Sequence, residues 1–195
     1  TGPILILLLV GALTGTWLLS GVIPAMIDFG LQIANPRFFL PACVLISALV
    51  SLATGSSWST SATIGIALIG IGKALDLPVG MVAGAVISGA YFGEKLSPLS
   101  DTTNLAPAMA GSELFAHIRY MLYTTLPSII ITLLLFIFLG WSFSSSGEVD
   151  TSLLSESIRD KFNISPLLFL VPLIVIIMIV KKTPPLLALF VGILL

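Results

Sequence analysis

Long apolar stretches separated by short polar ones make up almost the whole chain. Several of them reach the roughly 20 residues that a helix needs to cross a hydrocarbon core about 30 Å thick. Because the backbone polar groups must be satisfied inside the bilayer, the pattern predicts an all-α integral membrane protein. The predicted elements are a first transmembrane helix over 1–34, a re-entrant hairpin over 38–75, a broken transmembrane helix over 79–110, a transmembrane helix over 118–141, a polar loop over 142–163, a transmembrane helix over 164–180 and the start of a further, truncated helix over 186–195.

The stretch 38–75 is apolar at both ends and rich in Ser and Thr in the middle, around Gly55. We expect each apolar arm to be too short to cross the bilayer alone. Two interpretations compete: a single long kinked helix, or a re-entrant hairpin whose tip is the polar cluster. Irregular backbone at membrane depth is tolerated only where it faces protein or water, which would make such a tip functional. We favour the hairpin.

The segment 91–104 places two carboxylates and a lysine inside an otherwise apolar stretch. Each charge at bilayer depth costs about 2.5–3.5 kcal/mol on insertion scales, so it is rarely present without a role. Pro98 lacks a backbone donor and disfavours helix at Ser97, so we expect the helix to break there. A broken helix that carries charge in mid-membrane is typical of an ion or substrate site in a secondary transporter.

Glu94, Lys95 and Asp101 are the charged candidates of this segment. One interpretation makes them a structural ion pair that only satisfies buried charge. The density of oxygen ligands favours an ion site, because Na⁺ is a hard cation and takes carboxylate, hydroxyl and carbonyl oxygens. The neutral candidates beside the charges are Ser97, Ser100, Thr102, Thr103 and Asn104.

A second set of hydroxyl groups lies at the tip of the predicted hairpin. Hydroxyls in membrane helices often bond only to a carbonyl one turn back, but their concentration here favours a binding role. The candidates are Ser57, Ser59, Thr60 and Ser61. We expect the two polar clusters to hold Na⁺ together, at Asp101, Thr102, Asn104, Ser59 and Thr60.

Composition and charge exclude several classes of function. The chain is 57% hydrophobic and 9% charged, with a mean hydropathy of +1.15, whereas a soluble domain is roughly 25% charged. A net charge of −1 offers no electrostatic attraction for nucleic acid. Cys43 is the single cysteine, so there is no disulfide framework or thiolate metal motif. We expect no histidine at membrane depth to activate a nucleophile, which argues against an enzyme, and no cofactor beyond the transported ions.

The two ends of the sequence suggest a piece of a larger protein. The first apolar run has no basic flank or cleavage site, so we do not expect it to be a signal peptide. The last run, over 186–195, is too short to cross a bilayer. We therefore expect an internal segment of a transporter, one half of an inverted-repeat pair.

Two motifs carry a resemblance to a known family. They are Gly55–Gly65 (GSSWSTSATIG) and Tyr91–Ala106 (YFGEKLSPLSDTTNLA), preceded by Gly11–Trp17 (GALTGTW). Together they resemble the NhaC-type sodium/proton antiporter family, over most of residues 1–140. The resemblance implies a bacterial inner-membrane carrier of the wider ion-transporter superfamily, built from inverted repeats that each hold a re-entrant hairpin and an interrupted helix. It also implies relatives that exchange malate for lactate or move basic amino acids.

The expected mechanism is competition between H⁺ and Na⁺ at a buried carboxylate, since burial penalises the empty, charged site. We assign the ion to Asp101 and a shared proton or ion-pair role to Glu94, with Lys95 pairing whichever acid is not binding the ion. The alternative is a Na⁺- or H⁺-coupled carrier of an organic anion or amino acid, in which Lys95 meets a substrate carboxylate. The expected partners are Na⁺, H⁺, the lipid bilayer and, in that alternative, the organic solute; a homo-oligomer is compatible with the sequence.

Overall fold

The computed structural model describes residues 2–33, 35–143, 152–181 and 183–195, and every regular element in these ranges is helical. The elements, in chain order, are α1 (Gly2–Leu19), α2 (Val22–Ile33), α3 (Pro36–Thr54), α4 (Ser57–Thr60), the π-helical turn η1 (Ser61–Gly65), α5 (Ile66–Ala74), α6 (Val79–Leu96), α7 (Asp101–Ala110), α8 (Leu114–Phe143), α9 (Ser152–Lys161), the 3₁₀ turn η3 (Pro166–Phe169), α10 (Leu170–Val180) and α11 (Pro185–Leu194).

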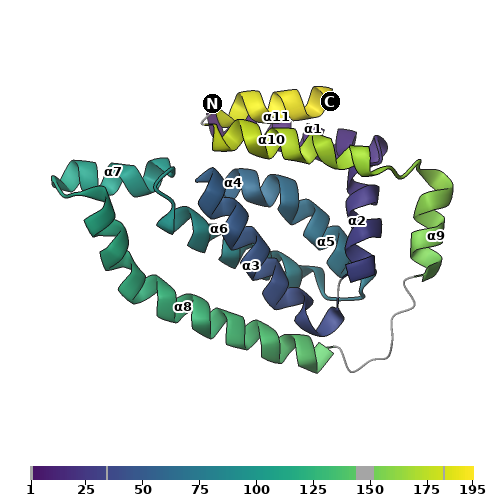
Figure 1. Ribbon diagram of the computed structural model, residues 1–195, viewed down its shortest axis with the longest axis horizontal. Helices are drawn as coiled ribbons and strands as arrows, with labels where there is room; N and C mark the ends of the chain where they lie inside the picture. Colours follow the sequence, from purple (N-terminus) through teal and green to yellow (C-terminus); the bar gives the residue numbers. More distant parts are fainter. Residues whose placement is uncertain (1, 34, 144–151, 182) are drawn as a thin grey trace.

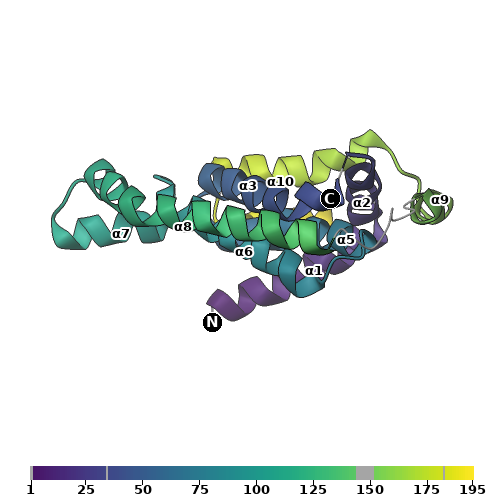
Figure 2. The same ribbon diagram turned by 90° about the horizontal axis from the view of Figure 1, so that it is seen from below.

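The helices form two packed groups. In Figure 1, α3, the rod α4–η1–α5 and α6 occupy the middle, and α8 runs along one side of them. On the other side α1, α10 and α11 pack together. Each group has its own apolar core, one around Leu40, Val44 and Val86, the other around Leu13, Trp17 and Leu189. Seen from below in Figure 2, the assembly is elongated, with α7 near one end and α9 near the other.

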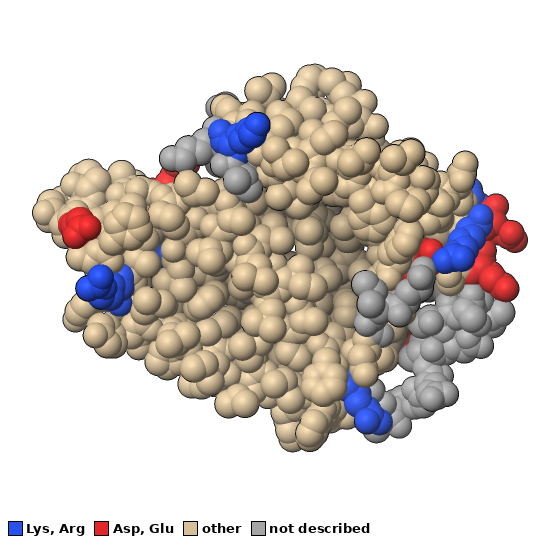
Figure 3. All heavy atoms as spheres, viewed as in Figure 1, with Lys and Arg blue, Asp and Glu red and all other residues tan. Residues whose placement is uncertain are grey.

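Membrane-compatible surface dominates the molecule. Two helices among the described residues, α3 and α8, are long and apolar enough to cross a membrane, or up to four spans if each of two bent helix pairs is one span. Only 11% of the apolar window of α8 is buried, so most of this 30-residue helix presents apolar side chains outward. On the face drawn in Figure 3 the charged side chains lie at the margins and the centre carries none.

The first predicted span is bent. Residues 1–34 were expected to form one helix, but α1 and α2 meet at an angle of 69°. Gly21, between them, has φ +90, a conformation that glycine adopts without the steric cost of a Cβ. Pro24 then falls in the first turn of α2, where its missing N–H costs no helical hydrogen bond.

The C-terminal part of the chain is also more divided than the pattern of apolar residues suggests. The predicted span over 164–180 begins with the turn η3, and α10 covers only 11 residues. A 92° bend separates this stretch from α9, the helix of the polar loop. α11 follows and packs against both α1 and α10.

The stretch predicted as a hairpin consists of two helical arms that diverge from Gly55 (Figure 1). The first arm, α3, begins at Pro36 and has 19 residues, so it is longer than expected and meets the length of a membrane span. Asn35 caps the N-terminus of α3, because its side-chain oxygen accepts a hydrogen bond from the Arg37 N–H at 3.1 Å. The re-entrant path and the inverted repeat stay predictions.

Candidate functional site

Two interruptions of helical structure touch each other at the end of the α3 and α6 group that lies next to α7 (Figure 1). One lies between α3 and α4 at Gly55, and the other lies between α6 and α7, around Pro98. A Cβ atom placed on Gly55 would come within 2.7 Å of the Leu99 carbonyl carbon and 2.9 Å of the Ser100 nitrogen. The backbones are therefore in direct contact, and only glycine fits at this crossing.

Local chemistry accounts for each interruption. Gly55 ends α3 in the left-handed conformation, with φ 73, and its N–H donates to the Ser51 carbonyl at 2.7 Å. Ser56 then caps the next helix by accepting a hydrogen bond from the Ser59 N–H at 3.2 Å. In the second interruption, Ser97 before Pro98 is extended, with ψ 124.

Glu94 joins the two interruptions. One of its carboxylate oxygens accepts a hydrogen bond from the Ser57 N–H at 3.1 Å, and the other accepts one from the Thr102 hydroxyl, also at 3.1 Å. Ser57 is the first residue of α4 and Thr102 the second of α7. The partly buried carboxylate thus lies where two helices begin, and the unpaired N–H groups of a helix N-terminus favour negative charge.

Other polar side chains of the predicted site hold the backbone of the interruptions in place. The Ser97 hydroxyl donates to the Leu52 carbonyl at 2.7 Å and so ties α6 to the end of α3. The Thr103 hydroxyl donates to the carbonyls of Glu94 and Lys95, at 3.0 and 3.2 Å. These contacts give additional hydrogen bonds to carbonyls near the ends of α3 and α6, where the helices are interrupted.

Asn104, Ser100 and Thr60 have similar structural contacts. The amide of Asn104 donates to the carbonyls of Pro98 and Ser100, at 2.8 and 2.7 Å. Ser100 caps α7 by accepting from the Thr103 N–H at 3.4 Å, and its hydroxyl lies 3.0 Å from that of Thr102. The buried Thr60 hydroxyl donates to the Ser56 carbonyl at 2.8 Å. Much of the predicted ligand set therefore supports the backbone around Glu94.

The structure separates the remaining predicted residues into a buried and an exposed group. Ser57 and Ser59 are buried and Ser61 half-buried, all on the rod α4–η1–α5, whose first residue bonds to Glu94. Asp101 and Lys95 are both exposed. Within the described part of the chain, neither side chain has a hydrogen bond or an ion pair, so the structural ion pair with Glu94 considered above does not form. Nor do the described ranges contain three or more His, Cys, Asp or Glu side chains grouped as for a metal ion.

Close packing between α3 and α6 positions Glu94. A Cβ atom on Gly89 would lie 2.1 Å from the Val44 carbonyl oxygen, and one on Gly93 would lie 2.2 Å from the Ala48 carbonyl oxygen. The Ser51 hydroxyl also bonds to the carbonyl of Ala90 across this contact. Two glycines four residues apart let membrane helices approach at backbone distance, and the spacing is a signal that sequence reasoning missed.

A second polar contact escaped the sequence analysis altogether. Asp28 of α2 is fully buried, and the Arg159 guanidinium on α9 donates to its carboxylate at 3.0 and 3.1 Å. The Ser155 hydroxyl donates to the same carboxylate. Because 131 positions separate Asp28 from Arg159, no local pattern in the sequence could have paired them.

Comparisons with known proteins identify the family of the chain. The Na⁺/H⁺ antiporter family model matches residues 89–195. The chain is 45% identical, over 98% of its length, to the Na⁺/H⁺ antiporter NhaC of Alkalihalophilus pseudofirmus and 42% identical, over 98%, to the malate-2H⁺/Na⁺-lactate antiporter of Bacillus subtilis. It is 41% identical, over 75%, to the arginine/ornithine antiporter ArcD of Halobacterium salinarum.

The matched chain covers 42% of the length of each of the first two relatives and 30% of the third. No solved structure matches it. The family match covers more than half of the chain and includes the interruption at Pro98 together with Glu94. The chain therefore belongs to the Na⁺/H⁺ antiporter family, with NhaC antiporters among its relatives.

Proposed function

We propose that the complete protein exchanges Na⁺ for H⁺ across the bacterial inner membrane, and that the two ions compete for the Glu94 carboxylate. The single observation that carries the proposal is the position of Glu94, whose two oxygens accept hydrogen bonds from the first residue of α4 and the second residue of α7, at touching interruptions. Interrupted helices of this kind form the ion and substrate sites of many secondary transporters. The names of several relatives, which are Na⁺/H⁺ antiporters, support the same choice of ions.

The surroundings of Glu94 suit a cation that replaces a proton. The Thr102 hydroxyl donates to Glu94, so its own lone pairs stay available, and the Ser100 hydroxyl lies 3.0 Å from it. Carboxylate and hydroxyl oxygens are the ligands that a hard cation prefers. We therefore propose that Na⁺ binds Glu94, Thr102 and Ser100, while the Ser57 N–H keeps the carboxylate oriented.

Protonation changes the same network in a defined way. A carboxylate accepts hydrogen bonds on both oxygens, whereas a carboxylic acid has one oxygen that donates. The Ser57 N–H can only donate, so it retains the carbonyl oxygen of protonated Glu94. The Thr102 hydroxyl can reverse its direction and accept, because a hydroxyl both donates and accepts. The site thus accommodates H⁺ or Na⁺ with one rotation of a hydroxyl group.

Asp101 takes a secondary role in this proposal. It was the first choice for the ion, but its side chain is exposed at the first turn of α7, without the two fixed donors that Glu94 has. A carboxylate in this position supplies negative charge near the site and is favoured by the positive end of the helix dipole. The assignment of the ion to Asp101 stays a prediction that the experiment below separates from the Glu94 proposal.

The test uses the complete protein in proteoliposomes, with a Na⁺ gradient imposed and no organic solute present. Internal pH reports proton movement. Glu94→Gln should stop Na⁺-driven proton movement, whereas Glu94→Asp should keep part of it. Asp101→Asn should keep a measurable fraction of the wild-type rate of proton movement. Glu113→Gln is the control, because Glu113 is exposed in the connection between α7 and α8. Full exchange in Glu94→Gln, with loss in Asp101→Asn, would return the ion to Asp101 and refute the proposal.

A second candidate function is coupled transport of an organic anion or amino acid. Its support is the pair of relatives whose names specify malate with lactate and arginine with ornithine, together with the exposed, unpaired Lys95 next to Glu94. If proton movement in the liposomes appears only after such a solute is added, the protein is a carrier of this kind.

A further inference from the structure

A groove between α6 and α8 has the dimensions of a small-molecule site. Its cavity volume is about 350 Å³, at the lower end of the range for pockets that bind small ligands and larger than a bare cation needs. The lining residues are Ser88, Tyr91, Phe92 and Lys95 from α6, and Thr124, Thr125, Ser128, Ile129 and Thr132 from α8.

The groove lies at the middle of a candidate membrane span. Ser128 is the fifteenth of the 30 residues of α8, and the other lining residues of that helix lie within four positions of it. Lys95 lies at the last turn of α6, immediately before the interruption at Pro98. Transporter sites gather near the bilayer midplane beside interrupted helices, and this groove satisfies both conditions.

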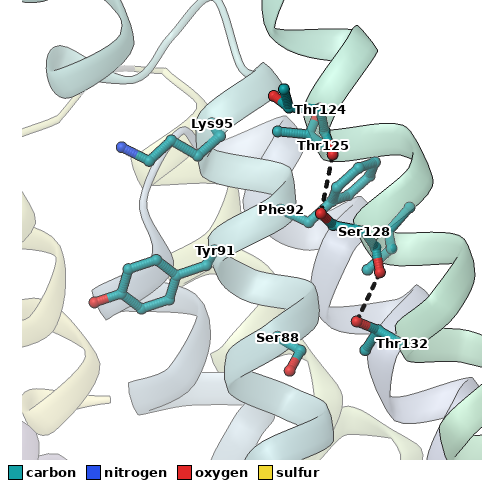
Figure 4. A pocket seen from close by; sticks show the side chains of 9 residues that line it. Ser88, Tyr91, Phe92, Lys95, Thr124, Thr125, Ser128 and Thr132 are labelled. Carbon is teal, nitrogen blue, oxygen red and sulfur yellow. Dashed lines mark hydrogen bonds between the residues drawn. The ribbon is translucent and has the colours of Figure 1, made fainter.

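The hydroxyl groups of the groove present acceptors. Each donates its proton to a carbonyl of its own helix, at distances between 2.7 and 3.0 Å, and so keeps its lone pairs free to accept. Figure 4 places the side chains of Thr124, Thr125, Ser128 and Thr132 along the side of α8 that faces α6, and we call their hydroxyls the hydroxyl column. The five residues are Ser88, Thr124, Thr125, Ser128 and Thr132.

The donors of the groove come from α6 alone. Lys95 and Tyr91 are exposed, lie one helical turn apart and extend away from the hydroxyl column in Figure 4. Neither side chain has a hydrogen-bond or ion-pair partner in the ranges that the structure describes. An unpaired ammonium group at membrane depth is costly, so an anionic ligand that neutralised Lys95 would bind there with a large electrostatic gain.

We propose that this groove binds a small carboxylic acid that also carries a hydroxyl or ammonium group. The carboxylate meets Lys95 and Tyr91 on α6, and the hydroxyl or ammonium group donates to the hydroxyl column on α8. The separation of donors and acceptors onto two helices explains why both groups are required. This inference deepens the second candidate function, on which it rests, and is independent of the assignment of Na⁺ to Glu94.

The groove lies next to the proposed ion site along the chain. Lys95 follows Glu94 directly, and Thr103 bonds to the carbonyls of both residues. A ligand that holds Lys95 therefore acts on the same turn of α6 that positions the Glu94 carboxylate. This proximity supplies a physical route by which occupation of the groove and occupation of the ion site can influence each other.

The test is direct binding to the complete protein, by calorimetry in detergent, of two matched pairs of compounds. L-malate and succinate differ by one hydroxyl group; L-norvaline and pentanoate differ by one α-ammonium group. We expect the first member of at least one pair to bind at least tenfold more tightly than the second, because the acceptor column bonds only the former. The preferred pair distinguishes a hydroxy acid from an amino acid. Equal affinity within both pairs, or no binding of either, overturns the proposal.

Variants locate the binding in the groove. Lys95→Gln should lower the affinity for the preferred ligand at least tenfold, whereas Lys95→Arg should retain that affinity. Ser128→Ala should reduce the difference in affinity between the two members of the pair. Thr14→Val on α1 is the matched control, because Thr14 also donates to a carbonyl of its own helix, at 2.8 Å, but lies outside the groove. Unchanged affinity in Lys95→Gln overturns the proposal. Exchange of Na⁺ for H⁺ without organic solute, measured separately, shows whether the ion proposal fails on its own.

Discussion

Replacement of Gly93 by alanine tests whether close packing between α3 and α6 holds the proposed ion site together. Gly93 precedes Glu94 and lies against the backbone of α3. A Cβ atom there would be 2.2 Å from the Ala48 carbonyl oxygen and 2.7 Å from the Leu52 nitrogen. Both are backbone atoms, so no side chain can rotate aside to make room.

The size of the effect follows from these distances. Ordinary contact for a Cβ begins at 3.4 Å, so the helices must separate by about 1 Å to relieve the contact of 2.2 Å. Such overpacking costs typically 1–3 kcal/mol. Alanine regains up to about 1 kcal/mol through its higher helix propensity. We therefore expect a net destabilisation of about 0–2 kcal/mol, or about 1–3 kcal/mol relative to a glycine-to-alanine change without the backbone clash.

Function should suffer more than stability. The hydrogen bond from the Ser57 N–H to Glu94 measures 3.1 Å, and a displacement of about 1 Å would break it. The Na⁺ concentration for half-maximal exchange should then rise by about tenfold or more, since hydrogen bonds to charged groups contribute roughly 1.5–3 kcal/mol.

The assay compares Gly93→Ala with Gly80→Ala in the complete protein. Gly80 lies on the same helix, and a Cβ there would meet no atom within 4 Å, so its replacement controls for the change in helix propensity. Thermal unfolding in detergent reports stability, and Na⁺-dependent proton movement in liposomes reports the site. If Gly93→Ala unfolds and transports like Gly80→Ala, the contact between α3 and α6 does not position Glu94.

Two further substitutions test other contacts by thermal unfolding. Gly55→Ala should destabilise the protein by about 1–3 kcal/mol. The reason is that the residue has φ 73 and that its Cβ would lie 2.7 Å from the Leu99 carbonyl carbon. If the variant unfolds at the wild-type temperature, the backbones at the crossing can relax to accept the Cβ. Arg159→Ala should lower the free energy of unfolding by about 1–3 kcal/mol, because it leaves the buried Asp28 carboxylate without its guanidinium partner. Lys161→Ala, which removes an exposed cation from the same helix, should change the stability little. Equal effects of the two substitutions would mean that the ion pair does not hold α9 in place.

Local chemistry is the part of this fold that the sequence predicts best. Pro98 removes a donor and Gly55 allows a left-handed conformation, so both positions interrupt a helix wherever the chain places them. The polar residues around Pro98 could likewise be identified as a group, because charge in an apolar stretch needs a reason. The helix predicted over 118–141 lies within α8, which begins four residues earlier, at Leu114, and ends two residues later, at Phe143.

What the sequence could not predict depends on long-range packing. Gly21 bends the first span, whereas Gly11 and Gly15 lie within α1, and only Pro24, three residues after Gly21, distinguishes the three in the local sequence. The choice between Glu94 and Asp101 depends on where α7 begins and which way its first turn faces, since only Glu94 reaches the start of α4.

The contact between the two interruptions has a kinematic consequence. Because Gly55 lies against Leu99 and Ser100, neither chain can straighten or slide without displacing the other. If the protein transports ions as proposed above, we expect both interruptions to move together as one unit. The turns at Asp76 and Gly111, where the backbone adopts positive φ, are then candidate pivots outside that unit.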